Sequence, residues 1–121
     1  MEVVDTFIFS KDLLFTSRIK DIARQSGRTP KVQRSVDGLC EALSSVSQDS
    51  RAVVLVDLDK PSVTLELIAN ALSQLESDSS SVVCFFSHVH LALAEKAKAL
   101  GFQTVIPRSK FVQMLPQIFT P

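Results

Sequence analysis

A short apolar run in the middle of the chain ends in two acidic residues. Residues Ala52–Val56 are apolar throughout, and Asp57, Leu58 and Asp59 follow at once. A strand that is apolar along its whole length is typical of a parallel sheet covered by helices on both faces. In such sheets ligands bind outside the carboxyl ends of the strands. The pattern therefore predicts that a buried strand delivers Asp57 to a site, with Asp59 as a loop acid near the next helix N-terminus.

Apolar runs and helical periodicity alternate five times along the 121 residues. The predicted strands are Val3–Phe9, Lys31–Val36, Ala52–Asp57, Val82–Ser87 and Gln103–Ile106. The second run alternates apolar and polar residues, as an edge strand does, whereas the first, third and fourth are nearly uniformly apolar. The sequence thus predicts a single α/β domain over residues 1–121, a (βα)5 three-layer sandwich whose parallel strands follow the order 2-1-3-4-5.

Between the strands, apolar residues recur at helical spacing, and we expect them to face the core. These stripes are Phe15/Ile19/Ile22, Leu39/Leu43/Val46, Ile68/Leu72/Leu75, Leu93/Ala97/Leu100 and Phe111/Leu115/Ile118. Pro116 falls inside the last stripe, where it removes a backbone hydrogen bond. We therefore expect a short or bent fifth helix.

Residues that favour helix ends lie at the borders of these stripes. Ser10 and Asp37 stand where N-caps are expected, and Pro61 suits a first helical position. Gly27 and Gly101 follow stripes, as glycines at helix C-termini do. These residues support the predicted order of elements.

The composition disfavours several classes of partner. Hydrophobic residues make up 45% of the chain and the formal net charge is 0, so no basic field is expected to attract nucleic acid or an anionic membrane. Cys40 and Cys84 stand singly in apolar stretches and are expected to be reduced core thiols. No apolar run has the length needed to span a bilayer. The chain is expected to be cytoplasmic.

Three segments resemble the receiver domain of bacterial response regulators. They are Val54–Pro61, Val83–His88 and Ala94–Gly101, and the likeness extends over essentially the whole chain. The resemblance implies the flavodoxin-like fold and a role in two-component signal transduction. It also implies that Asp57 occupies the phosphoacceptor position and that Ser87 occupies the position of the switch hydroxyl, which hydrogen-bonds the phosphoryl group.

The sequence departs from the receiver pattern after the first strand. Receivers hold Mg²⁺ there with an acidic pair, whereas this chain reads Ser10, Lys11 and Asp12. Mg²⁺ requires oxygen ligands, and anionic ones are preferred. Asp12 alone could serve, and its place at the start of a helix is expected to point it elsewhere. Lys11 is expected to bring a cation toward Asp57, which would replace the metal electrostatically but not catalytically.

A second departure follows the fifth strand. Receivers have a lysine there, and Arg108 aligns best with it, while Lys110 is the alternative if the loop shifts. Either residue would keep a cation near Asp57, and arginine would favour bidentate contact. Val105 stands at the position of the family's aromatic switch residue.

The two histidines form a weak metal signal. His88 and His90 lack a third ligand other than Asp57, so we expect His88 to be a hydrogen-bonding group beside Ser87, and we expect no metal and no cofactor. An anion-binding mouth is an alternative arrangement of the basic side chains. Its members would be Lys11, Arg18, His88 and Arg108.

The sequence favours a binding module over an enzyme. Residues 10–17 contain no glycine for a phosphate loop, and the GxSxG and HExxH motifs are absent. The leading hypothesis is a stand-alone, degenerate receiver that acts by protein contact or self-association through its fourth helix, fifth strand and fifth helix. Exposed candidates on that face are Lys96, Gln103 and Lys110. The alternatives are a phosphoacceptor that uses Asp57, with Asp12 or Asp59 recruited to a metal, and a small-anion sensor.

Overall fold

Strands and helices alternate in the computed structural model of the chain, which describes residues 4–10, 12–44, 52–58, 65–72, 81–87, 91–102 and 104–119. The elements, in chain order, are β1 (Thr6–Phe9), α1 (Leu13–Gln25), β2 (Pro30–Gln33), α2 (Val36–Ser44), β3 (Val53–Asp57), α3 (Leu65–Leu72), β4 (Ser81–Phe86), α4 (Leu91–Ala99), β5 (Thr104–Pro107) and α5 (Arg108–Phe119).

The five strands form one parallel sheet in the order β2-β1-β3-β4-β5, which confirms the predicted topology. Phe9 at the end of β1 pairs with Gln33 of β2 and Val56 of β3. The next residue of β3, Asp57, pairs with Phe85 of β4. Because the strands are parallel and in this register, the residues that follow them gather at one edge of the sheet.

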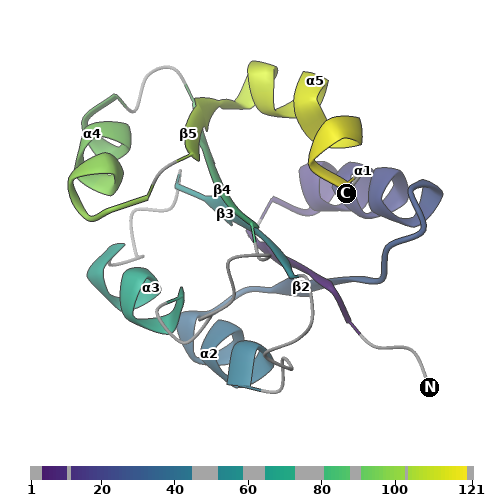
Figure 1. The fold of residues 1–121 in the computed structure, drawn as a ribbon, viewed down its shortest axis with the longest axis horizontal. Helices are drawn as coiled ribbons and strands as arrows, with labels where there is room; N and C mark the ends of the chain where they lie inside the picture. The colour runs from purple at the N-terminus through teal and green to yellow at the C-terminus, as the bar shows by residue number, and fades with distance from the viewer. Residues whose placement is uncertain are drawn as a thin grey trace.

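Helices cover both faces of the sheet, as the uniformly apolar strands require. Helices α2, α3 and α4 lie on one side, and α1 and α5 lie side by side on the other (Figure 1). Alternate strand residues divide between two buried clusters: Val54 and Val56 pack toward the first group of helices, whereas Val53 and Leu55 pack toward α1 and α5. The site side chain Asp57 continues the second series and points toward the α1 and α5 layer.

The edge strand is shorter than the sequence predicted. β2 ends at Gln33, and Val36 is the first residue of α2 rather than the last residue of the strand. The hydroxyl of Ser35 accepts a hydrogen bond from the Gly38 amide at 3.0 Å, which is the contact of an N-cap. The expectation that Asp37 caps α2 was wrong, because Asp37 already lies in the first turn.

Two helices differ from their predicted stripes. In α4 the buried residues are Ala94 and Ala97, whereas Leu100 lies beyond the helix and is 37% exposed. The fifth helix was expected to be short or bent, and α5 runs through Pro116 for 12 residues, so it is not short. A proline removes one backbone hydrogen bond from a helix. The helix continues past Pro116 because burial of apolar residues before and after it offsets that loss. Its buried residues are Phe111, Leu115 and Phe119.

Glycines end two of the helices, as predicted. Gly27 and Gly101 adopt φ values of 81° and 100°, in the region that favours glycine at helix C-termini. The first stripe is confirmed, since Ile19 is fully buried and Phe15 and Ile22 pack against its cluster. The expected roles of Pro61, Val46 and Leu75 lie outside the described residues.

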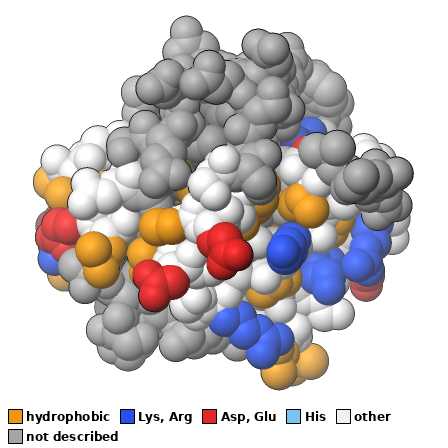
Figure 2. Space-filling model, turned by 90° about the horizontal axis from the view of Figure 1, so that it is seen from below, with side chains coloured by type: hydrophobic (Ala, Val, Ile, Leu, Met, Phe, Trp, Pro, Cys, Tyr) orange, Lys and Arg blue, Asp and Glu red, His pale blue; other side chains and the backbone are white. Residues whose placement is uncertain are grey.

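Charged and apolar side chains are interspersed on the surface shown in Figure 2, where the basic side chains lie mainly to the right. At the junction of α3 and α4, Lys96 Nζ lies 3.2 Å from Glu66 Oε1, and both side chains are exposed. A backbone hydrogen bond and the Lys96 ammonium lower the pKa of Glu66. Among the helices that the structure describes, none is both long and apolar enough to cross a bilayer.

Gln33 provides a test of the packing beside α2. Its side chain is 5% exposed, and neither of its amide atoms has a hydrogen-bond partner among the described residues. A buried amide in this state costs about 1–3 kcal/mol. We therefore expect Gln33→Met to raise the free energy of unfolding by about 1 kcal/mol in urea titrations. The exposed Gln113→Met is the control and should change it little, and a loss of stability in Gln33→Met would contradict the packing.

The two thiols should differ in reactivity. Burial raises the pKa of Cys84 from its ordinary value of 9.0 to about 12, whereas Cys40 is only partly buried. Because the thiolate is the reactive form, a thiol reagent at pH 8 should label Cys40 in the native protein and Cys84 only after unfolding. As pH rises, Cys84 loses its proton at a lower pH in the unfolded state than in the folded state. Ionisation of this thiol should therefore lower the free energy of unfolding as pH rises from 9.0 toward about 12. Rapid native labelling of a Cys40→Ser variant would show that Cys84 is not enclosed.

Candidate functional site

Asp57 is the last residue of β3, and its side chain is 0% exposed. The backbone just beyond it is held to the neighbouring strand, because the Leu58 amide donates to the Phe85 carbonyl at 2.9 Å. A buried carboxylate requires hydrogen bonds or a cation to offset the loss of water. The side chains that contact Asp57 therefore determine what this site can do.

Ser10 supplies one of these contacts. It follows β1 directly, is 1% exposed, and its hydroxyl donates to Asp57 Oδ2 at 2.7 Å. The same hydroxyl oxygen accepts from the Asp12 amide at 3.2 Å. Ser10 thus links the ends of β1 and β3. The expectation that Ser10 caps α1 was wrong, because the N-cap is Asp12. One of the acidic-pair positions is filled by a hydrogen-bond donor to Asp57.

Asp12 is the N-cap of α1, with φ −80° and ψ 102°. Its Oδ1 accepts from the Phe15 amide at 3.0 Å, and its Oδ2 lies 3.1 Å from Nη1 of Arg108. The expectation that Asp12 points away from the site was wrong. A capping carboxylate has two oxygens, and binding the helix amide with one leaves the other free to face the site.

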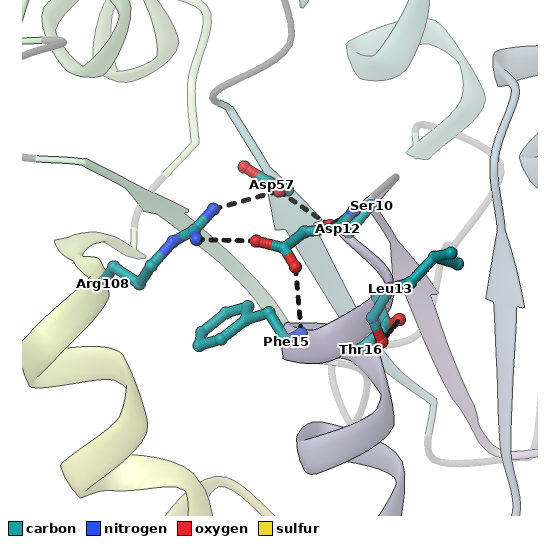
Figure 3. Close-up of polar contacts among 7 residues, drawn as sticks. All are labelled: Ser10, Asp12, Leu13, Phe15, Thr16, Asp57 and Arg108. Carbon is teal, nitrogen blue, oxygen red and sulfur yellow. Dashed lines mark hydrogen bonds and ion pairs between the residues drawn. The ribbon is translucent and has the colours of Figure 1, made fainter.

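Arg108 joins the two carboxylates. It is the first residue of α5, directly after β5, and its Nη2 lies 3.3 Å from Asp57 Oδ2 while Nη1 contacts Asp12. Figure 3 shows the guanidinium to the left of the two acidic side chains, with a dashed line to each and Phe15 below it. A single cation therefore connects β3, α1 and α5, which are far apart in the sequence.

Aromatic side chains support the guanidinium of Arg108. Its Cζ lies 4.4 Å from the ring centroid of Phe15 and 5.7 Å from that of Phe85. Phe85 is itself stacked on Phe111 of α5, with centroids 4.2 Å apart. Because β4 separates β5 from β3, Arg108 must reach Asp57 across Phe85, and the rings on its path orient the side chain.

Opposite charges meet in this cluster. Among the described residues, the carboxylates of Asp12 and Asp57 both face the guanidinium of Arg108. A cation at a helix N-terminus is unfavourable by itself, since that end carries the positive pole of the helix dipole. Opposite charges at about 4 Å attract by roughly 4 kcal/mol at an effective dielectric of about 20, before desolvation is subtracted. The two carboxylates thus hold Arg108 in a place that the helix alone would disfavour.

The structure places the remaining expected site residues less centrally. Ser87 follows β4 at the same edge, two residues beyond Phe85, and is partly buried. Lys110 is exposed on α5, so Arg108 and not Lys110 is the α5 cation that contacts Asp57. Arg18 is exposed on α1. The expected contributions of Lys11, Asp59, His88, His90 and Gln103 lie outside the described residues.

The described residues do not fit the Mg²⁺ ion that the receiver resemblance implies. No group of three or more His, Cys, Asp or Glu side chains comes together among them to hold a metal. The two carboxylates that approach each other, Asp12 and Asp57, already share Arg108. The site as described is a hydrogen-bonded ion-pair cluster.

Sequence reasoning placed Asp57 and Arg108 together but missed the double role of Asp12. A signal was present, because Asp12 stands immediately before an apolar helical stripe, where an N-cap is expected. In the sequence, Ser10 was an equally suitable N-cap. Its hydroxyl instead binds Asp57, 47 residues away, and this contact cannot be read from the local sequence.

No protein-family model matches the sequence, and no curated protein matches it in a sequence search. Solved structures match it closely in shape. A structure described as FixJ-N has a TM-score of 0.72 at 15% identity, with 98% of this chain and 94% of that chain covered. A receiver domain protein from Clostridium thermocellum has a TM-score of 0.73 at 16% identity, with coverages of 97% and 91%.

A third similar structure is a response regulator from Burkholderia pseudomallei that contains a phosphorylated aspartic acid, a calcium ion and citrate. Its TM-score is 0.72 at 12% identity, and the match covers 95% of this chain and 67% of that one. Identities this low relate the proteins by fold. The sheet order, the two helical layers and these whole-chain similarities together show that the chain has the flavodoxin-like fold of response regulator receiver domains.

Proposed function

We propose that this chain is a cytoplasmic, receiver-like signalling module that works by protein–protein contact without efficient Mg²⁺-dependent phosphorylation of Asp57. The observation that supports this proposal is the bridge from Arg108 to Asp12 and Asp57. Of the residues after β1, Asp12 is a partner of this fixed cation, and Ser10 donates a hydrogen bond to Asp57. The module is therefore a binding protein and not an enzyme.

Phosphoryl transfer to Asp57 would require a free carboxylate oxygen and a cation able to contact both the attacking and the leaving oxygens. Asp57 is fully buried, and its Oδ2 already accepts from Ser10 and contacts Arg108. Arg108 is in turn held by Asp12 and by the rings of Phe15 and Phe85. The arrangement provides charge compensation, but it leaves little freedom for a metal-bridged reaction.

The proposed contact surface comprises α4, β5 and α5. Arg108 ties the first turn of α5 to the edge of the sheet, and Phe111, Leu115 and Phe119 bury the inner side of that helix. Lys110 remains exposed on α5, and Leu91 is 63% exposed at the start of α4. An exposed cation on the firmly attached α5 and an exposed apolar side chain on α4 suit docking to another protein.

One alternative is a phosphoacceptor that uses Asp57 with Asp12 recruited to a metal. The convergence of both carboxylates on one cation favours it, because a divalent ion could take that cation's place. A small-anion sensor is less well supported, because the described ion pairs of Arg108 are to the carboxylates of Asp12 and Asp57.

The first test concerns phosphorylation. Incubation with acetyl phosphate and Mg²⁺ should give little or no mass increase of the intact protein, because Asp57 is enclosed by Ser10 and Arg108. Intact-protein mass spectrometry measures the adduct directly. A stoichiometric adduct that disappears in Asp57→Asn would establish the phosphoacceptor alternative.

The second test concerns the stability that Asp57 provides. Asp57→Ala leaves the Arg108 guanidinium and the Ser10 hydroxyl without their shared acceptor, so the free energy of unfolding should fall by about 1–3 kcal/mol. Asp21→Ala, at an exposed position of α1, is the matched control and should cost less than about 0.5 kcal/mol. Urea titrations of both variants measure the difference. A gain in stability for Asp57→Ala would show that Asp57 is a strained acid and not a stabilising partner.

A further inference from the structure

We infer that the basic outer face of α1 binds the acidic outer face of α2 in a second copy of this chain, so that copies associate head to tail. This contact goes beyond the proposed function, because it uses neither the Asp57 cluster nor the surface of α4, β5 and α5. The partner is specified by charge, since the two faces are opposite in sign and belong to opposite sides of one molecule.

The outer face of α1 carries mostly cations. Ser17, Lys20 and Arg24 are spaced three and four residues apart, so they form one stripe along the helix, the basic stripe. Ser17 and Arg24 are exposed, and Lys20 is partly exposed. Arg18 is a further exposed cation of α1, and Asp21 is its one acidic residue. The helix therefore presents a net positive charge to solvent.

The outer face of α2 is acidic. Asp37, Glu41 and Ser44 are all exposed and are spaced four and three residues apart, so they form a second stripe, the acidic stripe. Helix α2 contains no lysine or arginine. Figure 2 views the molecule from the side of α2 and α3, and acidic side chains lie there at the left and centre while basic ones lie mainly to the right.

The two stripes cannot neutralise each other within one molecule. Helix α1 packs on one face of the sheet and α2 packs on the other, so their outer faces point away from each other (Figure 1). Within the part of the chain that the structure describes, the side chains of Lys20, Arg24, Asp37 and Glu41 form no ion pair. These exposed charges are therefore available to another molecule.

The spacing of the two stripes matches when the helices run antiparallel. Lys20 would then face Glu41 and Arg24 would face Asp37, and the two serines that complete the stripes would lie opposite each other. Residues four apart are separated by about 6 Å along a helix, so both ion pairs can form at once. Antiparallel helices also place the positive end of each dipole beside the negative end of the other.

The charge pattern selects a head-to-tail contact over a two-fold one. A two-fold contact through α1 alone would bring the cations of both copies together, and one through α2 alone would bring the carboxylates together. In a heterologous contact each copy instead keeps one unoccupied stripe, so the assembly grows with concentration. The formal net charge of 0 provides no overall repulsion against such growth.

Sedimentation velocity of the wild-type chain from about 10 µM to about 1 mM measures this association. In about 20 mM salt the sedimentation coefficient should rise with concentration, and about 0.5 M salt should weaken the association at least about tenfold by screening the exposed charges. Wild-type protein that stays monomeric in low salt would overturn the inference. If that monomer bound vesicles of phosphatidylserine, the basic face of α1 would belong to an anionic lipid surface instead.

Two variants, each lacking one stripe, test the pairing itself. Lys20→Gln/Arg24→Gln removes the basic charges and Asp37→Asn/Glu41→Gln removes the acidic ones, so each variant alone should associate at least about tenfold more weakly than the wild type. Their equimolar mixture should form a heterodimer that grows no further, because each variant supplies the stripe that the other lacks. A mixture that remains monomeric would contradict the head-to-tail contact.

A control variant separates the stripe from the overall charge. Lys98→Glu, at an exposed position of α4, changes the net charge by as much as Lys20→Gln/Arg24→Gln does and should associate like the wild type. Circular dichroism establishes that each variant is folded. Loss of association in Lys98→Glu would overturn the inference and assign self-association to α4. Stoichiometric phosphorylation of Asp57 would overturn the proposed function alone, and the sedimentation results would still test this contact.

Discussion

The ion pairs of Arg108 are the interaction on which the carboxyl edge of this structure depends. One guanidinium contacts the N-cap of α1 and the buried acid at the end of β3, while its own residue begins α5. Each of these groups would be unfavourable alone: Asp57 is buried, and Arg108 lies at the positive end of a helix. Together they compensate one another, and the rings of Phe15 and Phe85 limit the directions that the arginine can take.

The parallel sheet makes this cluster possible. Because β1, β3 and β5 run in the same direction, the residues after them emerge at one edge although 96 residues separate Asp12 from Arg108. The order of strands sets β4 between the acid and the base, so a long side chain is needed for Arg108 to reach Asp57.

The chain shares the fold of receiver domains, and the resemblance of its sequence to them implies the phosphoacceptor position for the acid at the end of β3. Beside that acid, Ser10 contributes a hydroxyl and Asp12 serves as a helix cap. A carboxylate neutralised by a covalently attached cation is held in one state unless that cation moves. Control of such a module is then expected to come through movement of α5 or through a partner that contacts it.

The sequence by itself determined the strand order, the two helical layers and the position of Asp57, because these follow from apolar runs and short-range periodicity. It also indicated that a cation after β5 would face that acid. It could not decide between Ser10 and Asp12 as the cap of α1, nor the lengths of β2 and α5, because local preferences were nearly equal or were overridden by burial. Only the tertiary structure decided these points. It brought Asp57 within 2.7 Å of the Ser10 hydroxyl. Asp12 therefore caps α1 with one carboxylate oxygen and contacts Arg108 with the other.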